Sequence, residues 1–122
     1  MNTKILILMK DEKYSMSLRS FLLTKIEGSE ITAVSDIKSL AQLKLSEYST
    51  IIVSSELKEG VWLKALPVIK KVKSFILLGV VEGADVSEGI AIKYGADAFF
   101  KLPVNSETLL AAVKNVIDKV NN

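Results

Sequence analysis

The feature that most constrains the fold is a regular alternation of short apolar runs with longer stretches of helical spacing. Five runs rich in β-branched or aliphatic residues recur along the chain, at Lys4–Leu8, Glu30–Val34, Thr50–Val53, Phe75–Leu78 and Ala98–Lys101. Runs of this length are typical of strands, and each is followed by a segment long enough for a helix. The alternation predicts an α/β protein of five strand–helix units, with a parallel sheet covered on both faces. The length of 122 residues fits one domain over residues 1–122.

The segments between the runs place apolar side chains on one helical face. The expected faces are Leu18, Leu22 and Ile26; Ile37, Leu40 and Ala41; Trp62, Leu66 and Ile69; Val86, Ile90 and Tyr94; and Leu109, Val113, Val116 and Val120. Residues that favour helix ends lie where these segments begin or stop, at Gly28, Ser35-Asp36, Asp85 with Glu88, Gly95 and Asn105-Ser106. Each helix can therefore cover the sheet with one side.

Cysteine and histidine are both absent from the chain. Their absence excludes disulfides, imidazole bases, Cys/His metal sites and Ser-His-Asp triads. A flavin or dinucleotide carrier would need a glycine- and hydroxyl-rich phosphate loop after the first strand, and the segment Met9–Lys13 is not of that kind. We therefore expect no catalytic residues and no cofactor, so the protein should not be an enzyme.

The net charge of +2 comes with lysines spaced along helices rather than with a cluster of arginine and aromatic residues. The run Lys70-Lys71-Val72-Lys73 is typical of a solvated helix face, so we expect no binding of nucleic acid. The N-terminal apolar run is too short for a signal peptide, and no run approaches the length of about 20 apolar residues that spans a membrane. The sequence predicts a cytoplasmic protein that does not act at a membrane.

Ligand sites in doubly wound sheets lie beyond the carboxyl ends of the strands, where the winding reverses. The segments that would form this edge are Met9–Lys13, Ser54–Gly60, Gly79–Ala84 and Lys101–Val104. Any candidate site should therefore be sought among these four segments.

The most specific motif in the chain is Gly95-Ala96-Asp97-Ala98-Phe99-Phe100-Lys101-Leu102-Pro103. Its Gly-Ala-Asp opening, the aromatic residue two positions beyond the aspartate and the spacing of Pro103 resemble the receiver domain of bacterial response regulators, the CheY-like family. Lys4-Ile5-Leu6-Ile7-Leu8 and Thr50-Ile51-Ile52-Val53 are similar to the first and third strands of that family. The resemblance implies a flavodoxin-like (βα)5 fold, a doubly wound five-stranded parallel sheet with strand order 2-1-3-4-5, and a role in two-component signal transduction.

Receivers use an acidic pair after the first strand to hold a divalent cation, and an aspartate at the end of the third strand to accept a phosphoryl group. The aligned residues here are Met9 and Lys10 for the pair and Ser54 for the phosphoacceptor. A thioether is a poor ligand for a hard cation, an ammonium repels it, and a neutral alcohol is not an anionic nucleophile. Gly79 aligns with the switch hydroxyl and Leu102 with the lysine before the proline. The resemblance therefore implies a degenerate receiver, or pseudo-receiver, with no metal site.

Three acids could still supply the missing chemistry. Asp11 and Glu12 lie one and two residues beyond the aligned pair, and Glu56 follows the third strand. If one of them served the site, the chain would be a functional phosphoacceptor or a small enzyme. The competing interpretation of Asp11 and Glu12 is a polar helix entrance, where acidic side chains favour the positive end of the helix dipole.

Without chemistry of its own, a stand-alone domain of this kind would act by phosphorylation-independent binding to another signalling protein. Receivers commonly bind through the fourth helix, fifth strand and fifth helix, a face that here carries Lys93, Phe99, Lys101 and Lys114. Packing between helix and strand is the alternative role for Phe99. The last helix and strand could also join two copies of the chain in a dimer. The resemblance further implies a cis peptide bond before Pro103.

Overall fold

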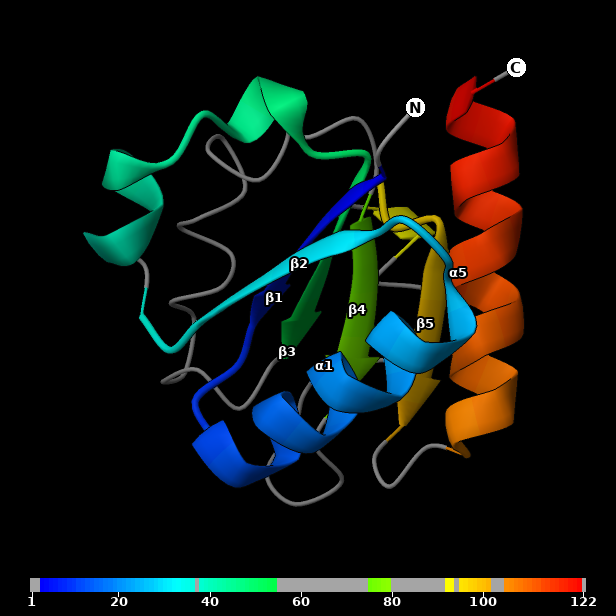
Figure 1. The fold of residues 1–122 in the computed structure, drawn as a ribbon, viewed down its shortest axis with the longest axis horizontal. Coiled ribbons are helices and arrows are strands. Elements are labelled where there is room, and N and C mark those ends of the chain that lie inside the picture. The colour runs from blue at the N-terminus through cyan, green and yellow to red at the C-terminus, as the bar shows by residue number, and fades with distance from the viewer. Residues whose placement is uncertain are drawn as a thin grey trace.

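The computed structural model of the protein describes residues 3–36, 38–54, 75–79, 92–93, 95–101 and 105–121. These residues form the strands β1 (Lys4–Leu8), β2 (Glu30–Val34), β3 (Thr50–Ser54), β4 (Phe75–Gly79) and β5 (Ala98–Lys101), the helices α1 (Glu12–Lys25) and α5 (Ser106–Asn121), and two short 3-10 helices, η1 (Lys38–Gln42) and η2 (Leu45–Glu47) (Figure 1). None of the helices in these ranges is long and apolar enough to cross a membrane. The helices expected around Trp62 and Val86 lie outside the described residues.

All five strands pair in one parallel sheet with the order β2-β1-β3-β4-β5. Ile7 of β1 lies beside Ala33 of β2 on one side and Ile52 of β3 on the other, so β1 is an interior strand. The chain moves from β1 outward to β2 and then returns past β1 to β3, which makes the β1–β3 boundary the point where the winding reverses. The expected flavodoxin-like fold and strand order are confirmed.

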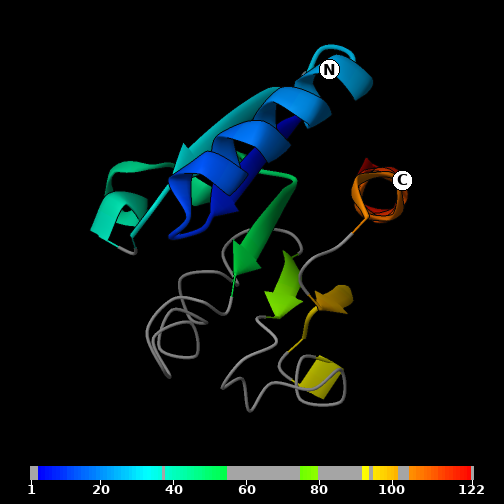
Figure 2. The ribbon, with the colours of Figure 1, turned by 90° about the horizontal axis from the view of Figure 1, so that it is seen from below.

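The main core lies between the sheet and the helices α1 and α5, which cover the same face of it (Figure 2). Apolar side chains of the strands, such as Ile5 and Ile52, meet those of both helices there. The buried helix residues include Leu18 and Leu22 of α1 and Leu109, Val113 and Val116 of α5, as their spacing predicted. In β1 every residue after the first is buried, as expected for a parallel strand covered on both faces.

The ends of the helices follow the sequence signals. Asp11 caps the beginning of α1, and Asn105 caps α5, where its side-chain oxygen accepts a hydrogen bond from the amide of Glu107 at 2.8 Å. Gly28 follows α1 with a φ of 74°, and Gly95 has a φ of 95°. Both glycines occupy the left-handed region that side chains disfavour, so each reverses the chain where a helical segment stops.

The segment between β2 and β3 differs from expectation, because it forms η1 and η2 rather than one amphipathic α-helix. Its buried side chains among the described residues are Leu40, Leu45 and Tyr48, and the step of five residues from Leu40 to Leu45 would set those two side chains about 140° apart around an α-helix. The backbone turns tightly instead, and the amide of Tyr48 bonds to the carbonyl of Leu45 at 3.1 Å. Of the face predicted for this helix, Ala41 is exposed and Ile37 lies outside the described residues.

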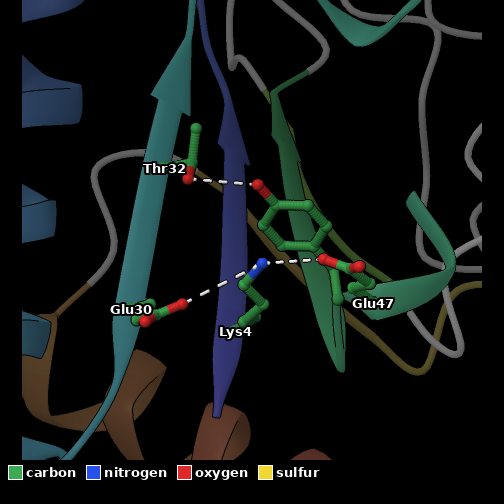
Figure 3. Close-up of polar contacts among 5 residues, drawn as sticks. Lys4, Glu30, Thr32 and Glu47 are labelled. Carbon is green, nitrogen blue, oxygen red and sulfur yellow. Dashed lines mark hydrogen bonds and ion pairs between the residues drawn. The ribbon is translucent and has the colours of Figure 1, made fainter. Parts of the chain in front are cut away.

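A polar network joins β1, β2 and the η2 region at the amino end of β1 (Figure 3). The ammonium of Lys4 lies 2.9 Å from a carboxylate oxygen of Glu47 and 3.9 Å from one of Glu30. It also lies 5.4 Å from the centre of the Tyr48 ring, whose hydroxyl is 3.1 Å from that of Thr32. The hydrogen bond between Lys4 and Glu47 raises the pKa of the lysine and lowers the pKa of the carboxyl group.

Candidate functional site

The edge at which the parallel strands end brings together three positions that the sequence singled out. Met9 directly follows β1, Ser54 is the last residue of β3, and Gly79 is the last residue of β4. The register places Ser54 beside Leu78 and Gly79 beside Lys101, so these strand ends are neighbours in the sheet. The sheet order puts Met9 and Ser54 at the boundary where the winding reverses. Leu102 and Pro103 lie outside the described residues.

Met9 is a member of the hydrophobic core. Only 1% of it is exposed, and it belongs to the cluster that contains Ile7, Leu18 and Leu22. Its amide donates to the carbonyl of Val34 at 3.1 Å, which extends the pairing of β1 with β2 by one residue. The side chain at this position therefore serves packing between the sheet and α1. A buried thioether offers nothing to a hard cation such as magnesium.

Two other residues of the aligned receiver site, Lys10 after Met9 in the sequence and Ser54 at the end of β3, have contrasting environments. Lys10 is exposed to solvent, whereas Ser54 is completely buried. Side chains alternate along a strand, so Ser54 shares its face of the sheet with Ile52, which packs in the main core. The carboxyl edge thus presents a cationic side chain on the outside and a neutral hydroxyl within.

The acids near this edge have defined structural positions. An oxygen of Asp11 accepts a hydrogen bond from the amide of Tyr14 at 3.0 Å, so Asp11 is the N-cap of α1. Glu12 is the first residue of the same helix and is exposed, while Glu56 lies outside the described residues. The interpretation of Asp11 as a helix entrance is confirmed. Across the part of the chain that the structure describes, no group of three acidic side chains is placed to hold a metal ion.

The residues of the expected interaction face lie at the far edge of the sheet, around β5 and α5 (Figure 1). Lys93 and Lys114 are exposed, Phe99 is half-buried, and Lys101 is the last residue of β5. The side chains of Ala98 and Phe100 pack against the core beneath α1 and α5. Because strand side chains alternate, Phe99 lies on the opposite face of the sheet from α5.

Sequence reasoning missed a cavity of about 310 Å³ between the beginning of α1 and the end of β2. Glu12, Ser15 and Met16 line it from the helix, and Val34, Ser35 and Ser39 line it from the other side. The hydroxyl-bearing residues come from separate segments, so no local motif marks them. Only the packing of α1 against β2 brings them together.

No family model matches the sequence, and no curated protein matches it. Solved structures do resemble it. The response regulator receiver domain protein from Clostridium thermocellum is 22% identical over 96% of this chain and 95% of its own, with a TM-score of 0.76. The receiver domain of Francisella response regulator 1452 is 20% identical over 97% and 98%, with a TM-score of 0.77.

A third such structure is the CheY-like response regulator receiver domain protein from Methanospirillum hungatei. It is 24% identical over 99% of this chain and 98% of its own, with a TM-score of 0.76. At these identities the likeness establishes the fold, which is the fold of response regulator receiver domains.

Proposed function

We propose that the chain is a degenerate receiver domain, which transmits a signal by binding another protein and does not accept a phosphoryl group. The observation that carries the proposal is the burial of Met9 at the position where receivers hold an acid. A side chain committed to the core cannot be exchanged for a cation ligand by a small rearrangement. The strand ends thus keep the receiver scaffold while the reactive groups are replaced.

The chemistry of phosphoryl transfer supports the same conclusion. Transfer to a carboxylate needs a cation that neutralises charge on the phosphoryl oxygens and a nucleophile that is already ionised. Ser54 offers a buried neutral hydroxyl, and Lys10 carries an exposed positive charge at the second position of the aligned acidic pair. Asp11 is occupied as a helix cap. Of the three acids named in the sequence, Glu12 remains, exposed at the start of α1.

Incubation with acetyl phosphate and magnesium, followed by intact mass measurement, tests the proposal. A receiver domain that retains the acidic pair and the aspartate serves as the positive control. We expect one phosphoryl adduct on the control and none on this chain, and no saturable heat when magnesium is added in a calorimeter. A stoichiometric adduct that maps to Asp11, Glu12 or Glu56 would overturn the proposal and favour the alternative of a working phosphoacceptor.

The proposed partner surface includes Lys101 at the end of β5 and Lys114 on α5. Reversing both charges should weaken association with a signalling partner, or with a second copy of the chain, without unfolding the domain. Lys44→Glu is a matched control, because Lys44 is exposed beside η2, on the side of the sheet away from β5. Sedimentation of the purified chain tests the dimer directly. Loss of association in the control, with none in the double variant, would place the surface elsewhere.

A further inference from the structure

The outer edge of β2 is the side of that strand that faces away from β1, and it lies at the rim of the sheet because β2 comes first in the strand order. The amide of Glu30 donates to the carbonyl of Thr3 at 2.7 Å, so the backbone groups of Glu30 face β1. Successive residues of a strand direct their backbone groups to opposite sides, so those of Ile31 and Ala33 face the outer edge. Such an edge is a template on which another chain can add a strand.

The strand β2 suits such pairing in its composition and in its packing. Its sequence, Glu-Ile-Thr-Ala-Val, is rich in β-branched residues, contains no proline and has its only charge at the first residue. Its side chains are used on both faces of the sheet, because Ile31 belongs to the main core and the hydroxyl of Thr32 lies 3.1 Å from that of Tyr48. The backbone groups of the outer edge are therefore what β2 offers to a further strand.

The side chain of Arg19 lies across this edge. Arg19 comes from α1, and its Nε donates to the outward carbonyl of Ile31 at 2.7 Å. Because the donor is ionised, this is a strong hydrogen bond. Ile31 is only 4% exposed although it belongs to an edge strand, as expected where the stem of an arginine covers the backbone. The outer edge is thus blocked at the residue that Arg19 contacts.

Two copies of the chain could otherwise pair through this edge about a two-fold axis. Antiparallel pairing centred on Thr32 sets Ile31 of one copy opposite Ala33 of the other, and each such pair exchanges both backbone hydrogen bonds. Arg19 competes for the Ile31 carbonyl, which this pairing needs as an acceptor. The two-fold axis would also bring two Arg19 guanidinium groups to the same short ladder, where like charges repel.

We propose that Arg19 is an autoinhibitory contact, which closes the outer edge of β2 and keeps two copies of the chain from pairing through it. Arg19 is carried by the helix whose other face packs in the core, so the edge is closed whenever α1 is docked on the sheet. The contact restricts association of the chain to its other surfaces. The proposal does not depend on whether the chain accepts a phosphoryl group.

Sedimentation of the parent, Arg19→Met and Lys13→Met over a range of concentrations tests the proposal. Methionine is close to arginine in length but has neither the charge nor a donor. We expect Arg19→Met to associate as the concentration rises, with a mean mass that approaches twice that of the monomer. Lys13→Met makes the same change of charge at an exposed site in the first turn of α1 and should sediment as the parent does. Equal behaviour of the two variants would overturn the proposal.

Hydrogen exchange of the β2 amides locates the contact. In the parent the amide of Ala33 should exchange faster than that of Thr32, which faces β1. In Arg19→Met the amide of Ala33 should become protected as the concentration rises. Association of the variant without this protection would overturn the proposal, because the copies would then meet elsewhere, for example through α5. Equal protection of both amides in the parent would also overturn it, since the edge would already be covered.

A second substitution in the variant removes the pairing itself. Ala33→Pro deletes the outward N–H that the second copy needs, and edge strands tolerate proline where the N–H does not serve the sheet. Arg19→Met combined with Ala33→Pro should therefore return to the mass of the parent, with amide spectra to verify that it is folded. A folded double variant that still associates would contradict the proposal. If the double variant does not fold, the exchange of Ala33 in Arg19→Met decides the question.

Discussion

Replacing Met9 by aspartate would restore an acid at the position that receivers use, and the structure predicts a large cost. Met9 is 1% exposed, so the change removes a fully buried side chain and leaves space between β1 and α1. Loss of a buried methionine side chain costs about 2–5 kcal/mol. Burial of the polar carboxyl group adds about 1–3 kcal/mol. We expect a total loss of about 3–8 kcal/mol. This is a large part of the stability of a domain of this size, which is about 5–15 kcal/mol.

Urea unfolding of the parent, Met9→Asp and Met16→Asp measures this cost. Met16 is 51% exposed, so the same substitution there should cost about 0.5 kcal/mol, mainly through helix propensity. Burial raises the pKa of the carboxyl group introduced at Met9, so the folded state binds more protons than the unfolded state between the two pKa values. The destabilisation should therefore be smaller at mildly acidic pH and grow as the pH rises through that window. The reasoning is refuted if both variants unfold at the same urea concentration.

Three further predictions concern single positions. Gly28→Ala should lower the stability measured by thermal unfolding by about 1–2 kcal/mol through backbone strain alone, because φ at Gly28 is +74° and an added Cβ would meet nothing within 4 Å. Gly28→Asn should lower the stability less. Asn105→Ala should cost about 1 kcal/mol by loss of the α5 cap, and Asn105→Asp should not. Lys4→Met should raise the pKa of Glu47, measured by NMR, toward its ordinary value. Because this pKa is depressed in the folded state, the stabilisation by Glu47 is present above its unfolded pKa and is lost as the pH falls through the folded pKa. If the loss of stability caused by Lys4→Met did not depend on pH, the ion pair would be contradicted.

The strands could be predicted closely because parallel strands buried on both faces are continuous apolar runs. The first strand has the expected bounds, and the third extends by one residue to Ser54. The prediction of an α-helix after the second strand was wrong, because the apolar content of a segment does not by itself determine whether its buried residues recur with the α-helical period. There the spacing of Leu40 and Leu45 fits no α-helical face, and the Asp36 side chain bonds to the amide of Ser39 and turns the chain locally.

The site could be predicted in part. The strand ends located Met9 and Ser54, because every parallel strand delivers its last residue to the same edge. Sequence spacing could not show that Met9 is buried, since that depends on the packing of α1 over β1. The cavity was missed for the same reason. Ser15 follows an ordinary helical pattern, and its missing hydrogen bond is visible only in three dimensions.

The alternation of side chains along β5 restricts the shape of any partner that binds there. Ala98 and Phe100 pack toward the helices, so Phe99 lies on the other face of the sheet. Phe99 and the exposed Lys114 of α5 are therefore on opposite sides of the sheet at its β5 edge. A partner that contacts both residues must therefore reach across the outer edge of β5, which is the last strand of the sheet. Single substitutions at Phe99 and at Lys114 would then affect two separate parts of that partner, and a partner that depends on one residue alone would dock on a single face of the sheet.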